Sequence, residues 1–197
     1  LPLPIALIAA FLIACGCANA QPRLLFVDPV LTDIGIQPLN ELPGAANRDL
    51  RHLTAIDPDH QNGFLYVHLA GSGGLPENSQ AIVAFAAARG FHVLSLAYPN
   101  WPSVGDLTAS SGDLAAPGAV RAERLFGTDS SALVAVDSAN SVVNRLVRLI
   151  AYLQSAYPNE RWGQYLQAGQ PTWPRIIVGG HSQGAGHAAY LAQEFPL

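Results

Sequence analysis

The chain has 197 residues, of which half are hydrophobic and 12% are charged, and its formal net charge at pH 7 is −4. This composition predicts one globular domain with its own core and excludes a disordered chain. The acidic balance argues against a nucleic-acid partner. The complete absence of lysine excludes the chemistry of P-loop proteins, pyridoxal-phosphate enzymes and kinases, which all depend on a lysine.

Residues 1–20 have the pattern of a targeting segment. Residues 3–14 are almost continuously apolar over the length of a signal-peptide core, and Ala18-Asn19-Ala20 supplies a cleavage pattern of small residues. A lipoprotein leader is the alternative, because Leu12-Ile13-Ala14-Cys15 resembles a bacterial lipobox, and a buried core helix is a third interpretation. We therefore expect a secreted or periplasmic protein that is attached to a membrane only if Cys15 is lipidated. Both cysteines lie in this segment, so the body at residues 21–197 has no disulfide and no catalytic thiol.

Four apolar runs in the body predict strands. Residues 24–27 and 53–56 are short, 64–69 is rich in aromatic and branched side chains, and 91–97 ends before a proline. A helix between the last two runs is capped by Asn78 or Ser79 and stops at a glycine. Residues 100–136 hold clustered Gly, Ser, Ala and Pro with little periodicity, and they predict a long excursion over the sheet edge that contributes to the substrate pocket.

A second, amphipathic helix is expected to begin at Asp137 or Asn140. Its apolar side chains recur at helical spacing, namely Val142, Leu146, Leu149, Ile150 and Leu153. The solvent face is expected to carry Asn144, Arg145 and Arg148. Residues 175–178 then predict a buried strand, and 183–195 a closing helix. This alternation predicts an α/β fold with a mainly parallel sheet and helices on both faces.

The five residues Gly180-His181-Ser182-Gln183-Gly184 lie between that last strand and that last helix. A G-x-S-x-G sequence in this position is the nucleophile-elbow pattern, a sharp turn that holds a serine hydroxyl clear of the sheet. With this motif and with His68-Leu69-Ala70-Gly71-Ser72-Gly73-Gly74, which is similar to the strand and oxyanion loop of that family, residues 64–195 resemble the first part of an α/β-hydrolase domain. The resemblance implies an esterase- or lipase-like serine hydrolase, acting on a small ester or lipid-like substrate without a cofactor or metal ion.

The resemblance also assigns roles to particular residues. Ser182 would be the nucleophile, and the backbone N–H of Gln183 would be one oxyanion donor. The second donor would come from Gly71 or Ser72, although the His-Gly-Gly-Gly run of better-known members is absent. Family members carry an acid and then a histidine after the serine. We therefore expect a chain truncated after its nucleophile helix, with the acid and the histidine in a missing C-terminal part.

The histidines within the chain are weaker candidates for the catalytic base. His187 and Glu194 follow Ser182, but both lie on the helix that leads away from it. His92 is expected to be structural, and His68 to orient the glycine loop at residues 71–74. His181 is expected to point away from the nucleophile, and His52 and His60 are weak candidates for the base. Tyr98, Trp101 and Arg124 are candidates for lying near the site.

Two other functions stay open at this point. A non-catalytic exported binding protein on a hydrolase scaffold would also lack the acid and base. A dinucleotide-binding protein is less favoured, because the glycine pattern that starts at Gly71 has Pro76 at its third position and no acidic residue ends the next strand.

Overall fold

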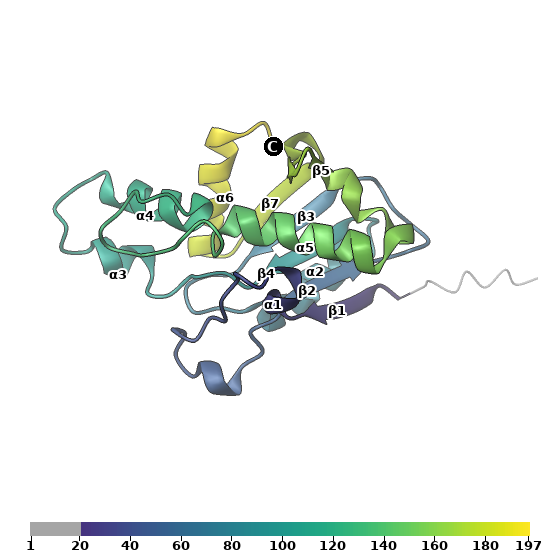
Figure 1. The fold of residues 1–197 in the computed structure, drawn as a ribbon, viewed down its shortest axis with the longest axis horizontal. Coiled ribbons are helices and arrows are strands. Elements are labelled where there is room, and N and C mark those ends of the chain that lie inside the picture. Colours follow the sequence, from purple (N-terminus) through teal and green to yellow (C-terminus); the bar gives the residue numbers. More distant parts are fainter. Residues whose placement is uncertain (1–20) are drawn as a thin grey trace, which may run out of the picture.

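The computed structural model describes residues 21–197, in which five strands form one mixed sheet (Figure 1). The strands are β1 (Arg23–Val27), β2 (His52–Ile56), β3 (Leu65–Leu69), β4 (His92–Leu96) and β7 (Ile176–Gly180). Their spatial order is β1-β2-β4-β3-β7. The leader predicted at residues 1–20 lies outside the described residues.

The prediction of a mainly parallel sheet is confirmed only for one half of it. Strand β3 pairs in parallel with both β4 and β7, whereas β2 pairs antiparallel with both β1 and β4. The reason lies in the connection between β2 and β3, residues 57–64, which is shorter than the dozen or so residues of a parallel crossover. Strand β3 therefore starts at the end of the sheet where β2 finishes and runs in the opposite direction.

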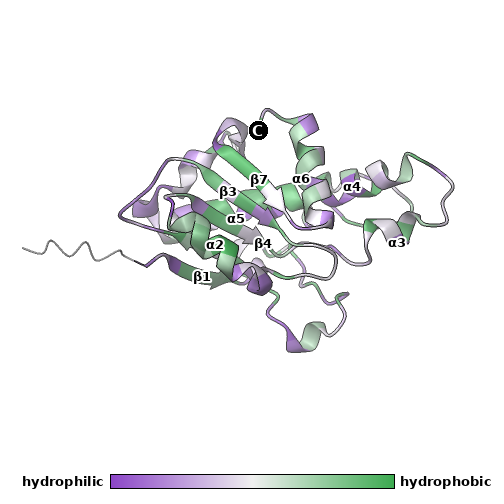
Figure 2. Ribbon diagram, turned by 180° about the vertical axis from the view of Figure 1, so that it is seen from behind, coloured by the Kyte–Doolittle hydropathy of each residue, from purple (hydrophilic) through white to green (hydrophobic). Residues whose placement is uncertain are grey.

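Helices cover both faces of the sheet, as predicted (Figures 1 and 2). Helix α2 (Gln80–Ala87) joins β3 to β4 on one face, and α5 (Val142–Ala156) precedes β7 on the other. Right-handed crossovers require opposite faces here, because the chain moves from β3 outward to β4 and then returns past β3 to β7. This reversal makes the boundary between β3 and β7 a topological switch point, and open α/β sheets bind ligands beyond the carboxyl ends of the strands at such a point.

The remaining elements are short, apart from two helices. They are α1 (Pro29–Thr32), α3 (Val104–Thr108), α4 (Ala116–Phe126), α6 (Gln183–Glu194), the hairpin strands β5 (Leu166–Gln167) and β6 (Gln170–Pro171), and the 3-10 turns Ala45–Asn47, Pro76–Ser79, Pro158–Glu160, Trp162–Tyr165 and Trp173–Arg175. None of the helices in residues 21–197 is long and apolar enough to cross a membrane.

The core consists of two main apolar layers, one on each side of the sheet, and the central strands are correspondingly apolar in Figure 2. The larger layer joins β3 and β4 to α5 and α6, and it includes Val67, Leu96, Leu149, Leu153 and Leu191. The smaller layer lies under α2 and includes Leu53, Ala55, Val83, Ala87 and Val93. Every residue of β2 and of β4 is buried, as expected for strands covered on both faces.

Two details of the helices differ from the sequence-based expectation. The cap of α5 is Ser141, whose hydroxyl accepts the N–H of Asn144 at 3.2 Å. The prediction that Arg145 lies on the solvent face of α5 is wrong: it is 1% exposed, and it donates hydrogen bonds to the backbone oxygens of Ala97, Gln37 and Asn140. A guanidinium that meets so many acceptors can be buried without a paired carboxylate.

The excursion after β4 contains two helices, α3 and α4, where the sequence showed little periodicity. Helix α4 carries the buried Glu123, whose carboxylate accepts the backbone N–H groups of Ser130, Ser131 and Val136. These bonds fold the following loop back onto α4, so the excursion is an ordered part of the carboxyl-end surface.

Candidate active site

The strongest feature of the site is the backbone of Ser182, at the junction between β7 and α6. Its φ is +52° and its ψ is −117°. A side-chain-bearing residue rarely adopts this conformation, which costs on the order of 1–3 kcal/mol and persists only where the surroundings enforce it. Ser182 is exposed, and its side chain forms no hydrogen bond with residues 21–197.

Close packing against the end of β3 enforces this turn. The N–H of His181 donates to the carbonyl of Leu69 at 3.1 Å. A Cβ added to Gly180 would lie 2.5 Å from the same carbonyl oxygen, and a Cβ added to Gly184 would overlap it. Both glycines of the motif are therefore required by contact with the backbone of β3, as the elbow pattern predicts.

The glycine loop, Gly71-Ser72-Gly73-Gly74 after β3, lies directly beside the elbow. A Cβ added to Gly71 would lie 3.1 Å from the Cβ of Ser182. The loop closes with a hydrogen bond from the N–H of Gly74 to the carbonyl of Gly71, and Gly73 has a φ of +66°. The N–H groups of Gly71, Ser72 and Gln183 donate to no residue in the described part of the chain. The structure thus brings together all four predicted site residues at the switch point.

The side chain of Gln183 is buried and reaches away from Ser182 into the excursion. Its Oε1 accepts hydrogen bonds from the backbone N–H of Val104 at 2.7 Å, from Arg124 at 3.1 Å and from the hydroxyl of Ser72 at 3.3 Å. Its Nε2 donates to the carbonyl of Asn100 at 3.0 Å. One side chain therefore contacts the glycine loop, the start of α3 and α4.

The residues that sequence analysis placed near the site do lie beside it, in supporting positions. Arg124 is fully buried and donates to Gln183 and to the carbonyl of Pro102. The hydroxyl of Tyr98 donates to the carbonyl of Ala70, and burial raises the pKa of Tyr98. The indole of Trp101 lies against Gly73, 3.5 Å from the position of an added Cβ.

Sequence reasoning did not single out Asn100. Its Oδ1 accepts the N–H of Gly73 at 3.2 Å, and its Nδ2 donates to the carbonyls of Gly71 and Gly74 at 3.0 and 2.8 Å. It is 1% exposed. A lone asparagine after a strand carries no sequence signal for this role, because its partners are backbone groups far away in the chain.

None of the histidines in residues 21–197 forms a hydrogen bond with Ser182. His187 is fully buried with its ring edge-on to Tyr98, and neither ring nitrogen has a described partner. Burial, and then the nearby Arg124, lower the pKa of His187 to about 3. Burial likewise lowers the pKa of His52 to about 3. Burial also lowers the pKa of His92 below its usual value. The buried ring of His92 agrees with the expectation that it is structural, and His52 and His187 are buried in the same way.

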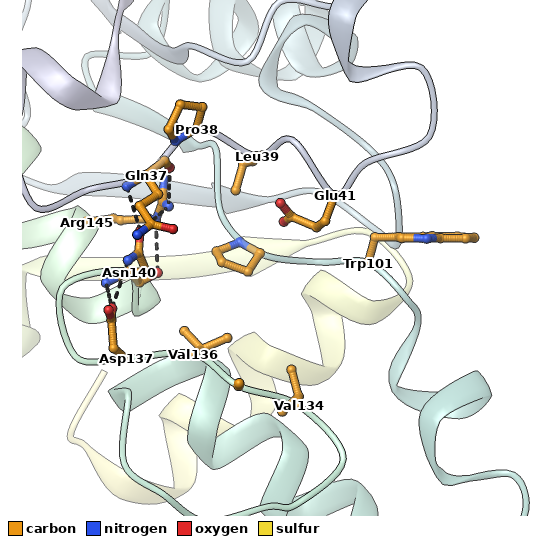
Figure 3. A pocket seen from close by; sticks show the side chains of 12 residues that line it. Gln37, Pro38, Leu39, Glu41, Trp101, Val134, Val136, Asp137, Asn140 and Arg145 are labelled. Carbon is orange, nitrogen blue, oxygen red and sulfur yellow. Dashed lines mark hydrogen bonds between the residues drawn. The ribbon is translucent and has the colours of Figure 1, made fainter.

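A cavity of about 270 Å³ opens on the carboxyl-end side of the sheet (Figure 3). Its walls come from three segments and from the region where α5 starts. They are Gln37, Pro38, Leu39 and Glu41; Pro99 and Trp101 after β4; Val134, Ala135 and Val136 of the excursion; and Asp137, Asn140 and Arg145. The Glu41 carboxylate and Leu39 lie on one side of it, and Val134 and Val136 on the other. Trp101 lines this cavity and also lies against Gly73 of the glycine loop, whereas Ser182 and Gln183 are not among the residues that line it.

No cluster of three or more His, Cys, Asp or Glu side chains suited to a metal ion occurs in residues 21–197. Comparisons of the chain with protein-family models, with curated proteins and with solved structures find no match. The geometry described above therefore carries the functional interpretation.

Proposed function

We propose that this protein is an exported serine hydrolase of the α/β-hydrolase type that cleaves carboxylic esters through an acyl-enzyme on Ser182. The observation that carries the proposal is the strained backbone of Ser182, which close packing of Gly180 and Gly184 against β3 enforces. Its position at the β3–β7 switch point supports a ligand-binding role for the same residues. Export is proposed from the leader-like sequence of residues 1–20 alone.

The proposed reaction begins with attack of the Ser182 hydroxyl oxygen on the ester carbonyl carbon, while a general base takes the hydroxyl proton. The N–H groups of Gln183 and of Gly71 or Ser72 stabilise the resulting oxyanion, each by about 3 kcal/mol. The carbon–oxygen bond to the alcohol then breaks, and the alcohol leaves with a proton from the base. Water next attacks the acyl-enzyme, which releases the acid and restores Ser182. We propose that part of the substrate occupies the cavity beside Trp101.

The base and acid have no counterpart in contact with Ser182 among residues 21–197. Strand β7 forms an edge of the described sheet, and its Ile177 is 45% exposed. An unpaired edge of this kind can accept a further strand. We propose that residues outside the described part extend the sheet along β7 and bring the acid and the histidine to Ser182, in the order that the hydrolase pattern requires.

A fluorophosphonate probe on the full-length gene product tests the proposal. We expect covalent labelling of the wild-type protein, and complete loss of labelling and about a 10⁴-fold or larger loss of esterase activity in Ser182→Ala. Ser155→Ala, which changes an exposed serine on α5, is the matched control and should label normally. Labelling that survives in Ser182→Ala would overturn the assignment of Ser182.

A non-catalytic binding protein is the second candidate, favoured by the lack of a described base near Ser182. In that case the wild-type protein would neither label nor turn over any ester, although it folds normally.

A further inference from the structure

We propose that the side chains of Asn100 and Gln183, here called the amide pair, are positioning residues that set the geometry of the oxyanion hole. They would hold the glycine loop, which supplies one donor, at a fixed distance from the start of α6, which supplies the other. This inference rests on the proposed function, since it concerns how the same site is assembled.

The amide pair connects two segments that share no continuous secondary structure. Asn100 binds the glycine loop at Gly71, Gly73 and Gly74, with donor–acceptor distances of 2.8–3.2 Å. The carbonyl of Asn100 in turn accepts the side-chain N–H of Gln183. Gln183 carries one proposed donor on its own backbone, so the chain of contacts runs from one half of the oxyanion hole to the other.

The orientation of each amide is dictated by partners that can act in only one way. Around Gln183, the N–H of Val104 can only donate and the carbonyl of Asn100 can only accept. Around Asn100, the N–H of Gly73 can only donate, whereas the carbonyls of Gly71 and Gly74 can only accept. A flip of either amide would place like groups together, so each side chain has a single arrangement.

Ser72 and Arg124 complete the fixation of Gln183. The hydroxyl of Ser72 donates to Oε1 of Gln183, which joins the two candidate donor residues directly at 3.3 Å. Arg124 donates to the same oxygen and forms no ion pair with a carboxylate in residues 21–197. The Arg124 guanidinium therefore binds a neutral amide oxygen, and this hydrogen bond holds Gln183 against the excursion.

Asn100→Asp separates positioning from general packing. One carboxylate oxygen would still accept the N–H of Gly73, but the other would face the carbonyls of Gly71 and Gly74 and repel them. Burial between two carbonyls raises the pKa of that introduced carboxyl group. Its protonated form can donate again, so a lower pH should restore the glycine loop.

The measurement is the rate of fluorophosphonate labelling of the full-length protein between about pH 5 and about pH 8, divided by the wild-type rate at the same pH. For Asn100→Asp we expect about a 100-fold loss at the higher pH and recovery at the lower pH, mainly in the maximal rate of inactivation and little in probe affinity. Asn100→Ala should be slow at both pH values. Asn159→Asp, at an exposed position remote from the site, should match wild type throughout.

A milder variant guards against misfolding. Ser72→Ala removes only the hydroxyl that joins the glycine loop to Gln183, and we expect about a fivefold loss in the maximal rate with an unchanged melting temperature. Wild-type labelling rates in Ser72→Ala and in folded Asn100→Asp, together with loss of labelling in Ser182→Ala, would overturn the inference and leave the proposed function intact. A Ser182→Ala variant that still labels would overturn both.

Discussion

The amide pair and the two histidines His52 and His187 are almost equally hidden from solvent, but their side chains differ in hydrogen bonding. Each side-chain nitrogen and oxygen of Asn100 and Gln183 is hydrogen-bonded. In contrast, Nε2 of His52 and both ring nitrogens of His187 have no partner among the described residues. Burial alone therefore does not identify a functional group. The difference lies in whether the surrounding backbone is arranged to satisfy it.

The elbow, which contains Gln183, and the surroundings of the two histidines should also respond differently to change. Around the elbow, contacts are made by backbone atoms that cannot move aside, so small alterations should have large effects. Around the histidines, the main requirement is that the ring stays neutral, so pH should be the effective perturbation. Three experiments examine this difference, from the largest expected effect to the smallest.

Gly184→Ala should be the most damaging single change. Its Cβ would overlap the carbonyl of Leu69 and lie 2.7 Å from that of Ala70, so β3 and the elbow would have to separate. We expect a loss of about 4–5 kcal/mol in the free energy of unfolding, measured by urea denaturation, together with loss of labelling. Gly118→Ala is the matched control, since nothing lies within 4 Å of an added Cβ and the residue is inside α4. It should stabilise the protein by about 0.5–1 kcal/mol. Equal stabilities for the two variants would contradict this account of the elbow.

Acidification should act through the histidines and leave the amide pair untouched, because amides do not titrate. The pKa values of His52 and His187 are about 3 in the folded protein, below the unfolded value of 6.5. The unfolded chain therefore binds more protons than the folded protein. The free energy of unfolding decreases as the pH falls below about 6.5, and it keeps decreasing until the pH reaches about 3. At pH 5 each histidine should cost about 2 kcal/mol, or about 4 kcal/mol together.

Urea denaturation at about pH 7.5 and about pH 5 measures this loss. His187→Leu removes one of the two groups without removing a hydrogen bond, so it should reduce the pH dependence by roughly half. A stability that is the same at both pH values would show that these rings are not buried in the neutral form.

Ser182→Gly should produce the smallest effect, and one of opposite sign. Glycine adopts a φ of +52° without strain, so we expect a gain of about 1–2 kcal/mol in the free energy of unfolding, with complete loss of labelling. Ser155→Gly, within α5, should instead cost about 0.5 kcal/mol. A Ser182→Gly variant that is less stable than wild type would mean that the serine backbone is not strained.

The amino-acid pattern predicted much of this architecture for clear physical reasons. The five principal strands and the helices α2, α5 and α6 follow from local hydrophobic periodicity and from stop signals such as Gly90. The position of Ser182 between a strand and a helix was also predicted, because the two flanking glycines are a local requirement of the turn.

The remaining features depend on contacts between distant segments. The antiparallel direction of β2 follows from its short connection to β3, together with the place of β4 between these strands in the sheet, and hydrophobic periodicity encodes neither. Arg145 occupies a helical position typical of the surface, but backbone carbonyls from three other segments surround it. Asn100 has the same character, since its role exists only once the glycine loop has folded beside it.

The dependence of the elbow on β3 also orders the events of folding. Leu69 and Gly180 pair in the sheet although they are far apart in the chain, and the turn at Ser182 can form only against that completed pairing. Loop-closure entropy opposes non-local contacts of this kind and slows their formation. A nascent or partly folded chain would therefore present an ordinary, unstrained serine. We therefore expect the strained conformation of Ser182 only in chains in which β3 and β7 have paired.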